Sequence, residues 1–111
     1  MRHYHPMAVF EYDPWLLEFI EVGRFTFQWA RGNRTKNLIR HGVKTEDCEE
    51  VFLGGGALPI GTQVFPPVDE SRYAIVGETA AGRPLFIVFT LRSGRVRVIS
   101  ASRDQARKGG L

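Results

Sequence analysis

The segment that most constrains the fold is residues 83–101, whose pattern predicts a β-hairpin with two chemically different faces. Ser93-Gly94 suits a two-residue hairpin turn. This turn places three pairs directly opposite one another: Arg92 and Arg95, Thr90 and Arg97, and Val88 and Ile99. Because side chains alternate along a strand, one face is apolar and comprises Leu85, Ile87, Phe89, Leu91, Val96 and Val98. The other face ends in a polar and basic group that comprises Thr90, Arg92, Arg95 and Arg97.

Positive charge is concentrated in two stretches of the 111-residue chain, whose formal net charge is +3. Residues 31–44 carry five cations and no acid, and residues 92–108 carry six cations against Asp104 alone. Three arginines at one hairpin tip repel one another unless an anion or water lies among them. The arrangement therefore suits a phosphate backbone, and the segregation of charge favours a polyanionic partner. A solvated surface with uneven charge is the alternative interpretation.

The length of the chain suits one domain with its own core. Cys48 is the sole cysteine, so no intrachain disulfide can form, and we expect a small core residue in a cytoplasmic protein. No apolar run reaches the length of a membrane span, so no membrane association is expected. His3 and His5 are two possible metal ligands, too few for a site, and we expect neither a metal nor a cofactor.

Helix-capping residues, the spacing of apolar residues, and the positions of glycine and proline predict the remaining secondary structure. We expect helices over residues 13–22, 34–41 and 45–53, the last capped by Thr45. We expect strands over residues 25–29 and 72–77, a loop over residues 54–67, and a weak helix or tail over residues 102–108. The predicted fold class is α+β, an antiparallel sheet of about four strands with two helices packed on one face. The other face of the sheet is expected to be free.

The helix expected over residues 13–22 has two interpretations. Its apolar stripe would enlarge the core and comprises Trp15, Phe19 and Ile20. Its acidic side chains would instead let the helix lie on the basic hairpin as a built-in restraint. The sequence leaves both interpretations open.

Short motifs recur in a fixed order along residues 25–103. The first are Phe27-Gln28-Trp29, Gly32-Asn33, Lys36-Asn37 and Arg40-His41-Gly42-Val43. They are followed by Glu50-Val51-Phe52, Arg72-Tyr73 with Gly77, Gly82-Arg83, Val88-Phe89-Thr90 with Arg92, and Arg95, Arg97 and Ile99-Ser100-Ala101. In this order and spacing they resemble the BrnT family, the ribonuclease toxins of type II toxin–antitoxin pairs, which have a RelE-like fold. Ala30 stands where the family usually has Asp, and the C-terminal segment is shorter than is usual.

The resemblance implies a metal-independent endoribonuclease that cleaves RNA and inhibits translation. It makes residues 25–108 one BrnT-like domain, residues 1–24 an N-terminal extension with a short amphipathic helix, and residues 109–111 a tail. It also implies a BrnA-like ribbon-helix-helix antitoxin as partner, with promoter DNA bound only through the toxin–antitoxin complex. The alternative, favoured by Ala30 and the short C-terminus, is a catalytically weak homologue that acts as a protein- or nucleic-acid-binding module.

Metal-free RNA cleavage requires removal of the 2′-hydroxyl proton, stabilisation of the added negative charge and protonation of the leaving oxygen. We expect Arg92 and Arg97 to stabilise that charge, because a guanidinium fork matches phosphate oxygens. His41 is the candidate general base, since the ordinary pKa of histidine lies near neutrality, and capping a helix end is its alternative role. The remaining RNA-binding candidates are Lys36, Arg40, Tyr73, Arg95 and Arg103. Lys36 is also a candidate proton donor, and Tyr73 could stack on a base.

Overall fold

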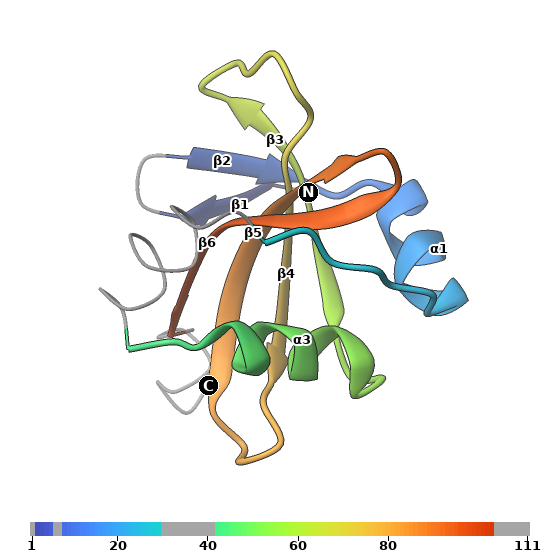
Figure 1. Ribbon diagram of the computed structural model, residues 1–111. Coiled ribbons are helices and arrows are strands. Elements are labelled where there is room, and N and C mark those ends of the chain that lie inside the picture. The colour runs from blue at the N-terminus through green and yellow to red at the C-terminus, as the bar shows by residue number, and fades with distance from the viewer. Residues whose placement is uncertain (1, 6–7, 30–41, 104–111) are drawn as a thin grey trace.

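The computed structural model describes residues 2–5, 8–29 and 42–103 and shows an α+β fold (Figure 1). Its strands are β1 (Arg2–His5), β2 (Ala8–Glu11), β3 (Leu58–Phe65), β4 (Tyr73–Glu78), β5 (Pro84–Arg92) and β6 (Arg95–Arg103). Its helices are α1 (Pro14–Val22) and α3 (Thr45–Leu53). The strands form one antiparallel sheet in the order β1-β2-β3-β4-β5-β6. In these ranges no helix is long and apolar enough to cross a membrane.

The main core lies between the sheet and the two helices, as the predicted fold class requires. The apolar hairpin face turns toward the helices, and Phe89 at its centre is fully buried. Phe52 of α3 packs edge-on against Phe89 with ring centroids 5.2 Å apart. The α+β prediction, with helices on one face of an antiparallel sheet, is therefore confirmed.

Helix α1 begins and ends where the sequence predicts. The Asp13 side chain accepts a hydrogen bond from the Trp15 backbone N–H at 3.0 Å, and Gly23 ends the helix in the left-handed region at φ 71°. Leu16 is fully buried in the main core, and Phe19 packs against it. The structure therefore supports the core interpretation of this helix, because its apolar stripe faces the sheet on the side away from the basic hairpin face.

Helix α3 confirms the predicted helix over residues 45–53 but corrects its cap. Thr45 is the first helical residue, and Lys44 occupies the capping position. The Asp47 carboxylate accepts a hydrogen bond from the Lys44 backbone N–H at 2.9 Å. A carboxylate in the first turn both satisfies this N–H and meets the positive end of the helix dipole.

Strand β3 contradicts the loop predicted over residues 54–67. The many glycines and prolines suggested irregular backbone, yet Leu58–Phe65 pairs with both β2 and β4. A register shift between Pro59 and Gly61 accommodates these residues within the ladder. A Cβ at Gly61 would collide with the Glu11 carbonyl oxygen, so this glycine permits the close approach of β2.

The strand predicted over residues 25–29 is reduced to one parallel bridge between Phe27 and Val96. Two backbone hydrogen bonds make it, from Gln28 N–H to the Val96 carbonyl at 2.8 Å and from Val96 N–H to the Thr26 carbonyl at 2.7 Å. The Trp29 indole N–H donates to the Glu49 carboxylate at 2.7 Å and so ties this segment to α3. The predicted helix over residues 34–41 lies outside the described residues.

A bulge in the β5–β6 ladder corrects the predicted hairpin register beyond its tip. Arg92 faces Arg95 and Thr90 faces Arg97, as predicted, but Val88 faces Ser100 instead of Ile99. The register shift lies between Val88 and Phe89. Strand β6 also continues through Arg103, so residues 102–103 belong to the sheet and not to a helix or tail.

The sheet face opposite the helices carries a second core, so it is not wholly free. Phe10 of β2 is fully buried there and contacts Phe86 of β5 with ring centroids 5.9 Å apart. Strands β2 and β5 are not neighbours in the sheet order. Their contact therefore requires the sheet to curl until the β1–β2 hairpin covers part of this face.

The variant Phe10→Ala is expected to lower the free energy of unfolding by about 3–5 kcal/mol, because it opens a cavity in this second core. The control Phe65→Ala removes a side chain that is 62% exposed, so its loss should stay within roughly 0.5–1 kcal/mol. Urea denaturation followed by circular dichroism measures both. Equal losses in the two variants would contradict a second core built on Phe10.

Candidate nucleic-acid interface

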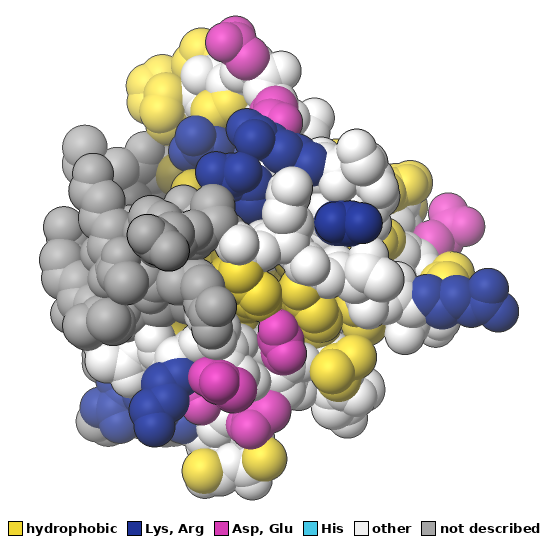
Figure 2. Space-filling model, viewed as in Figure 1, with side chains coloured by type: hydrophobic (Ala, Val, Ile, Leu, Met, Phe, Trp, Pro, Cys, Tyr) yellow, Lys and Arg dark blue, Asp and Glu magenta, His cyan; other side chains and the backbone are white. Residues whose placement is uncertain are grey.

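The basic tip of the β5–β6 hairpin consists of Arg92, Arg95 and Arg97. Cross-strand pairing sets Arg92 opposite Arg95, and the Thr90–Arg97 pair lies on the same face two residues further from the turn. Arg92 and Arg95 are exposed, and Arg97 is half-buried. Figure 2 shows basic side chains gathered in the upper half of the visible face, with acidic side chains above them. The predicted convergence of these three arginines on one face follows from the observed register.

Arg92 is held by a carboxylate from the loop between β3 and β4. Its Nε donates to Glu70 Oε2 at 3.1 Å, and its Nη2 donates to Glu70 Oε1 at 3.3 Å. Both side chains are 47% exposed. Among the described residues, Arg95 and Arg97 form no comparable ion pair with a carboxylate. An anion thus already occupies one of the three guanidinium groups, on the face where the sequence predicts phosphate.

Thr90 fixes the loop that carries Glu70. It is 2% exposed, and its hydroxyl donates to the Ser71 carbonyl at 2.8 Å. The sequence places Thr90 in the polar hairpin group without a defined role. Its structural role is to satisfy a backbone carbonyl next to the basic tip.

Arg72 is a fourth cation that the sequence interpretation did not assign to the site. The Gln63 backbone N–H donates to the Arg72 carbonyl at 2.8 Å, which extends the β3–β4 ladder by one residue. The next residue, Tyr73, packs on the helix side of the sheet. Alternation therefore directs Arg72 to the face that carries Thr90 and Arg97. The sequence signal that could have assigned Arg72 to the site is its position directly before Tyr73, which points to the opposite face of the sheet.

Tyr73 and Arg103 do not join the basic tip. The Tyr73 ring packs between Trp15 and Phe89, with centroid distances of 5.0 and 5.5 Å, on the face covered by α1. Arg103 pairs with Leu85, which lies five residues before Thr90 in β5 and is buried on the helix side. At about 3.3 Å per residue, the Leu85–Arg103 pair lies roughly 17 Å along the strand from the Thr90–Arg97 pair. The bulge turns Arg103 toward the helix side.

Lys36, Arg40 and His41 lie outside the described residues. The residue that follows His41 in the chain, Gly42, accepts a hydrogen bond from Arg83 Nη1 at 3.0 Å. Arg83 also approaches the Asp47 carboxylate of α3 at 3.6 Å. These contacts hold Gly42 beside the start of β5, whereas Arg92 ends that strand.

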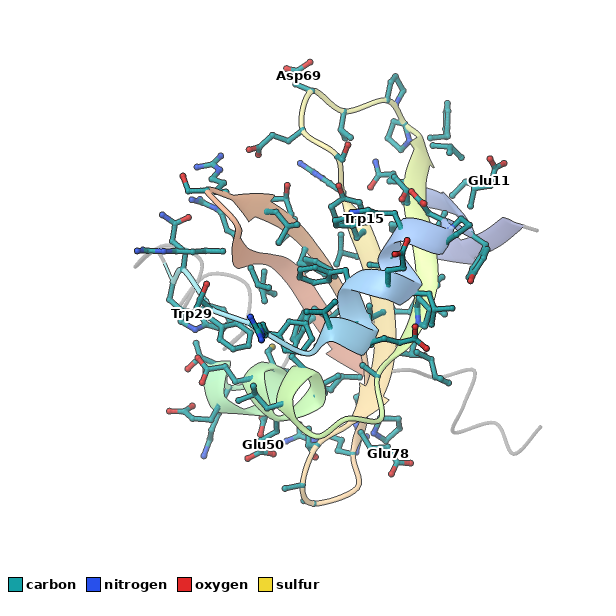
Figure 3. The ribbon with its side chains drawn as sticks, turned by 90° about the vertical axis from the view of Figure 1, so that its right-hand side faces the viewer. Glu11, Trp15, Trp29, Glu50, Asp69 and Glu78 are labelled. Atoms are coloured by element: carbon teal, nitrogen blue, oxygen red, sulfur yellow. The ribbon has the colours of Figure 1, made fainter. Side chains whose placement is uncertain are left out.

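An open acidic groove of about 710 Å³ lies beside α3 and the β4–β5 turn. Its carboxylates are Glu46, Glu49, Glu50 and Glu78. Glu50 accepts a hydrogen bond from the Ala80 backbone N–H at 2.9 Å. Figure 3 shows Glu50 and Glu78 at the opposite end of the molecule from Asp69, which tops the β3–β4 loop. The carboxylates of this groove repel the phosphates that the basic tip attracts.

Cys48 is a buried, unreactive thiol. Burial raises its pKa to about 12 from an ordinary 9.0, and the carboxylates of Asp47 and Glu49 add to the shift. The neutral thiol is the form that persists at physiological pH, and only the thiolate is a good nucleophile. The prediction that Cys48 is a small core residue is confirmed.

The variant Thr90→Val is expected to loosen the loop that carries Glu70, because it leaves the Ser71 carbonyl without its donor. The backbone NMR order parameters of residues 69–71 should fall from about 0.85, typical of rigid backbone, toward about 0.6. The control Thr90→Ser keeps the hydroxyl and should retain the order parameters of the parent. Equal decreases in both variants would show that the hydroxyl does not hold the loop.

A comparison with known protein families gives a match over most of the chain. The model of a family described as the ribonuclease toxin BrnT of type II toxin–antitoxin systems matches residues 29–108, which is more than half of the chain. This range contains α3, β3, β4 and the β5–β6 hairpin with its basic tip. No curated protein and no solved structure matches the chain. The chain belongs to the BrnT family of ribonuclease toxins of type II toxin–antitoxin systems.

Proposed function

We propose that this chain is a metal-independent endoribonuclease that cleaves RNA and thereby inhibits translation. The observation that carries the proposal is the convergence of Arg92, Arg95 and Arg97 on one exposed end of the sheet. Membership of a ribonuclease toxin family makes RNA the substrate class to which this cationic surface is assigned.

The proposed reaction begins when the ribose 2′-hydroxyl oxygen attacks the adjacent phosphorus. The 2′-oxygen–phosphorus bond forms, the phosphorus–5′-oxygen bond breaks, and a 2′,3′-cyclic phosphate and a 5′-hydroxyl result. Negative charge accumulates on the phosphoryl oxygens in the transition state. Arg92 and Arg97 are assigned to stabilise that charge, because guanidinium forks bind phosphate oxygens through two parallel hydrogen bonds. Arg95 and Arg72 support RNA binding from the same face.

The proton steps are assigned to residues outside the described ranges. His41 is proposed to accept the 2′-hydroxyl proton, and Lys36 to give a proton to the departing 5′-oxygen or to contact phosphate. Arg40 is proposed to contact phosphates. Tyr73 and Arg103, which lie away from the basic tip, would contact RNA only at a second position. Gly42, the next residue after His41 in the chain, is held beside the start of β5, whereas Arg92 ends that strand. His41 and Arg92 can therefore act on one phosphate only if the chain before Gly42 brings His41 toward the end of β5.

The proposed partner is a BrnA-like ribbon-helix-helix antitoxin, encoded with the toxin and acting with it in the cytoplasm. Promoter DNA would be bound through the antitoxin in the complex. The antitoxin belongs to the definition of a type II system, in which a protein neutralises the toxin.

The assignment of the arginines predicts the outcome of an RNA cleavage assay in EDTA with the purified chain and a long RNA. Arg92→Ala and Arg97→Ala should each slow cleavage by on the order of 100-fold, because each removes a donor aimed at charge that develops in the transition state. The control Arg24→Ala removes an exposed cation that follows α1 and should stay within about twofold of the parent rate. Equal rates in all three variants would contradict the assignment.

The same assay tests the proposed base and the alternative function. His41→Ala should slow cleavage by at least about 100-fold and remove the acidic limb of the pH–rate profile, because a general base must be deprotonated to act. An unchanged profile would exclude His41 as the base. RNA binding by the parent chain without any cutting would instead identify a binding module.

A further inference from the structure

We infer that Glu70 is an internal anion that competes with the RNA phosphate for Arg92 and so sets the affinity of the basic tip for its substrate. The inference rests on the proposed function in one respect, that phosphate is the natural anion at this site. Glu70 would compete with any phosphate for Arg92, whether or not the chain cleaves RNA.

The contact uses the part of Arg92 that phosphate recognition would use. Glu70 occupies Nε and Nη2 together, through hydrogen bonds of 3.1 and 3.3 Å. This edge of the guanidinium group presents two parallel N–H donors, and it binds carboxylate and phosphate oxygens with the same geometry. A phosphate that engages this edge must therefore displace Glu70.

The exchange is energetically feasible because the pair is exposed. Both side chains are 47% exposed, so water screens their attraction and hydrates each partner after separation. Such surface pairs contribute little to stability. A phosphate that contacts Arg95 and Arg97 as well as Arg92 has three cationic neighbours, whereas Glu70 pairs with Arg92. Glu70 therefore weakens phosphate binding without preventing it.

The position of Glu70 is built into the fold. Its loop is anchored on one side by the Gln63 side-chain amide, whose Nε2 donates to the Pro66 carbonyl at 2.8 Å. On the other side the buried Thr90 hydroxyl holds Ser71, the residue next to Glu70. Thr90 and Arg92 share one face of β5, so the residue that anchors the loop and the residue that Glu70 pairs with are neighbours on that strand.

The chain offers a matched control in the preceding residue. Asp69 is exposed, carries the same charge and lies in the same loop, and in Figure 3 it points away from the sheet at the outer end of that loop. Asp69→Asn and Glu70→Gln change the net charge equally. A difference between them therefore reports the specific contact with Arg92 and not the general field.

The experiment follows the Arg92 Nε–Hε signal by NMR while inorganic phosphate is titrated into the folded chain. The signal is assigned by its loss in Arg92→Lys. Glu70→Gln should lower the half-saturating phosphate concentration by roughly two- to fivefold relative to the parent, whereas Asp69→Asn should change it by less than about 1.5-fold. Equal half-saturation in the parent and both variants, or equal shifts in both variants, would overturn the inference.

A second titration, with a non-cleavable 2′-O-methyl oligoribonucleotide, separates this inference from the proposed function. Glu70→Gln should tighten oligonucleotide binding, and the gain should vanish in the Arg92→Ala background because the competitor then has no target. Failure of the parent chain to bind the oligonucleotide would count against the proposed function. The phosphate titration would still decide whether Glu70 competes for Arg92.

Discussion

The register of β5 against β6 determines both the main core and the basic tip. The turn at Ser93-Gly94 places Phe89 opposite Val98 and Arg92 opposite Arg95. This pairing directs the apolar side chains to one face of the hairpin and the arginines to the other. A slip by one residue would bring arginines under the helices and expose the aromatic core. Burial of Phe89 against Phe52 and Tyr73 prevents that slip, and the same packing energy therefore holds the basic tip in place.

The basic tip and the acidic groove occupy separate places in this arrangement. The basic tip lies at the turn end of the hairpin, while the acidic groove lies beside α3 and the β4–β5 turn. A polyanion is attracted to the basic tip and repelled from the acidic groove. Glu70 brings a negative charge to the basic tip and balances part of the repulsion between Arg92 and Arg95.

Local sequence signals predicted the elements that local interactions define. The α1 boundaries follow from Asp13, Pro14 and Gly23, and the hairpin tip follows from Ser93-Gly94 with strict alternation on both sides. Strand β3 was missed because its pairing with β2 and β4 is long-range, and its glycines and prolines locally favour a loop. The curl that brings Phe10 onto Phe86 is a property of the whole sheet and leaves no local pattern.

The candidate site was predictable to the same extent. Alternation placed Arg92, Arg95 and Arg97 together, but it could not reveal the bulge that turns Arg103 away or the loop that brings Glu70 to Arg92. Tyr73 suited base stacking by residue type, whereas the position of α1 decides that its ring packs between Trp15 and Phe89. Contacts between segments distant in sequence thus determine which cations remain available to a ligand.

A crystal structure of the chain bound to a short RNA with a 2′-deoxy sugar at the scissile position would show directly whether the basic tip holds the phosphate. We expect a phosphate within hydrogen-bonding distance of both Arg92 and Arg97, on the sheet face opposite the helices, with Glu70 moved off Arg92. A phosphate bound elsewhere, with the Arg92–Glu70 pair intact and Arg97 in water, would contradict it.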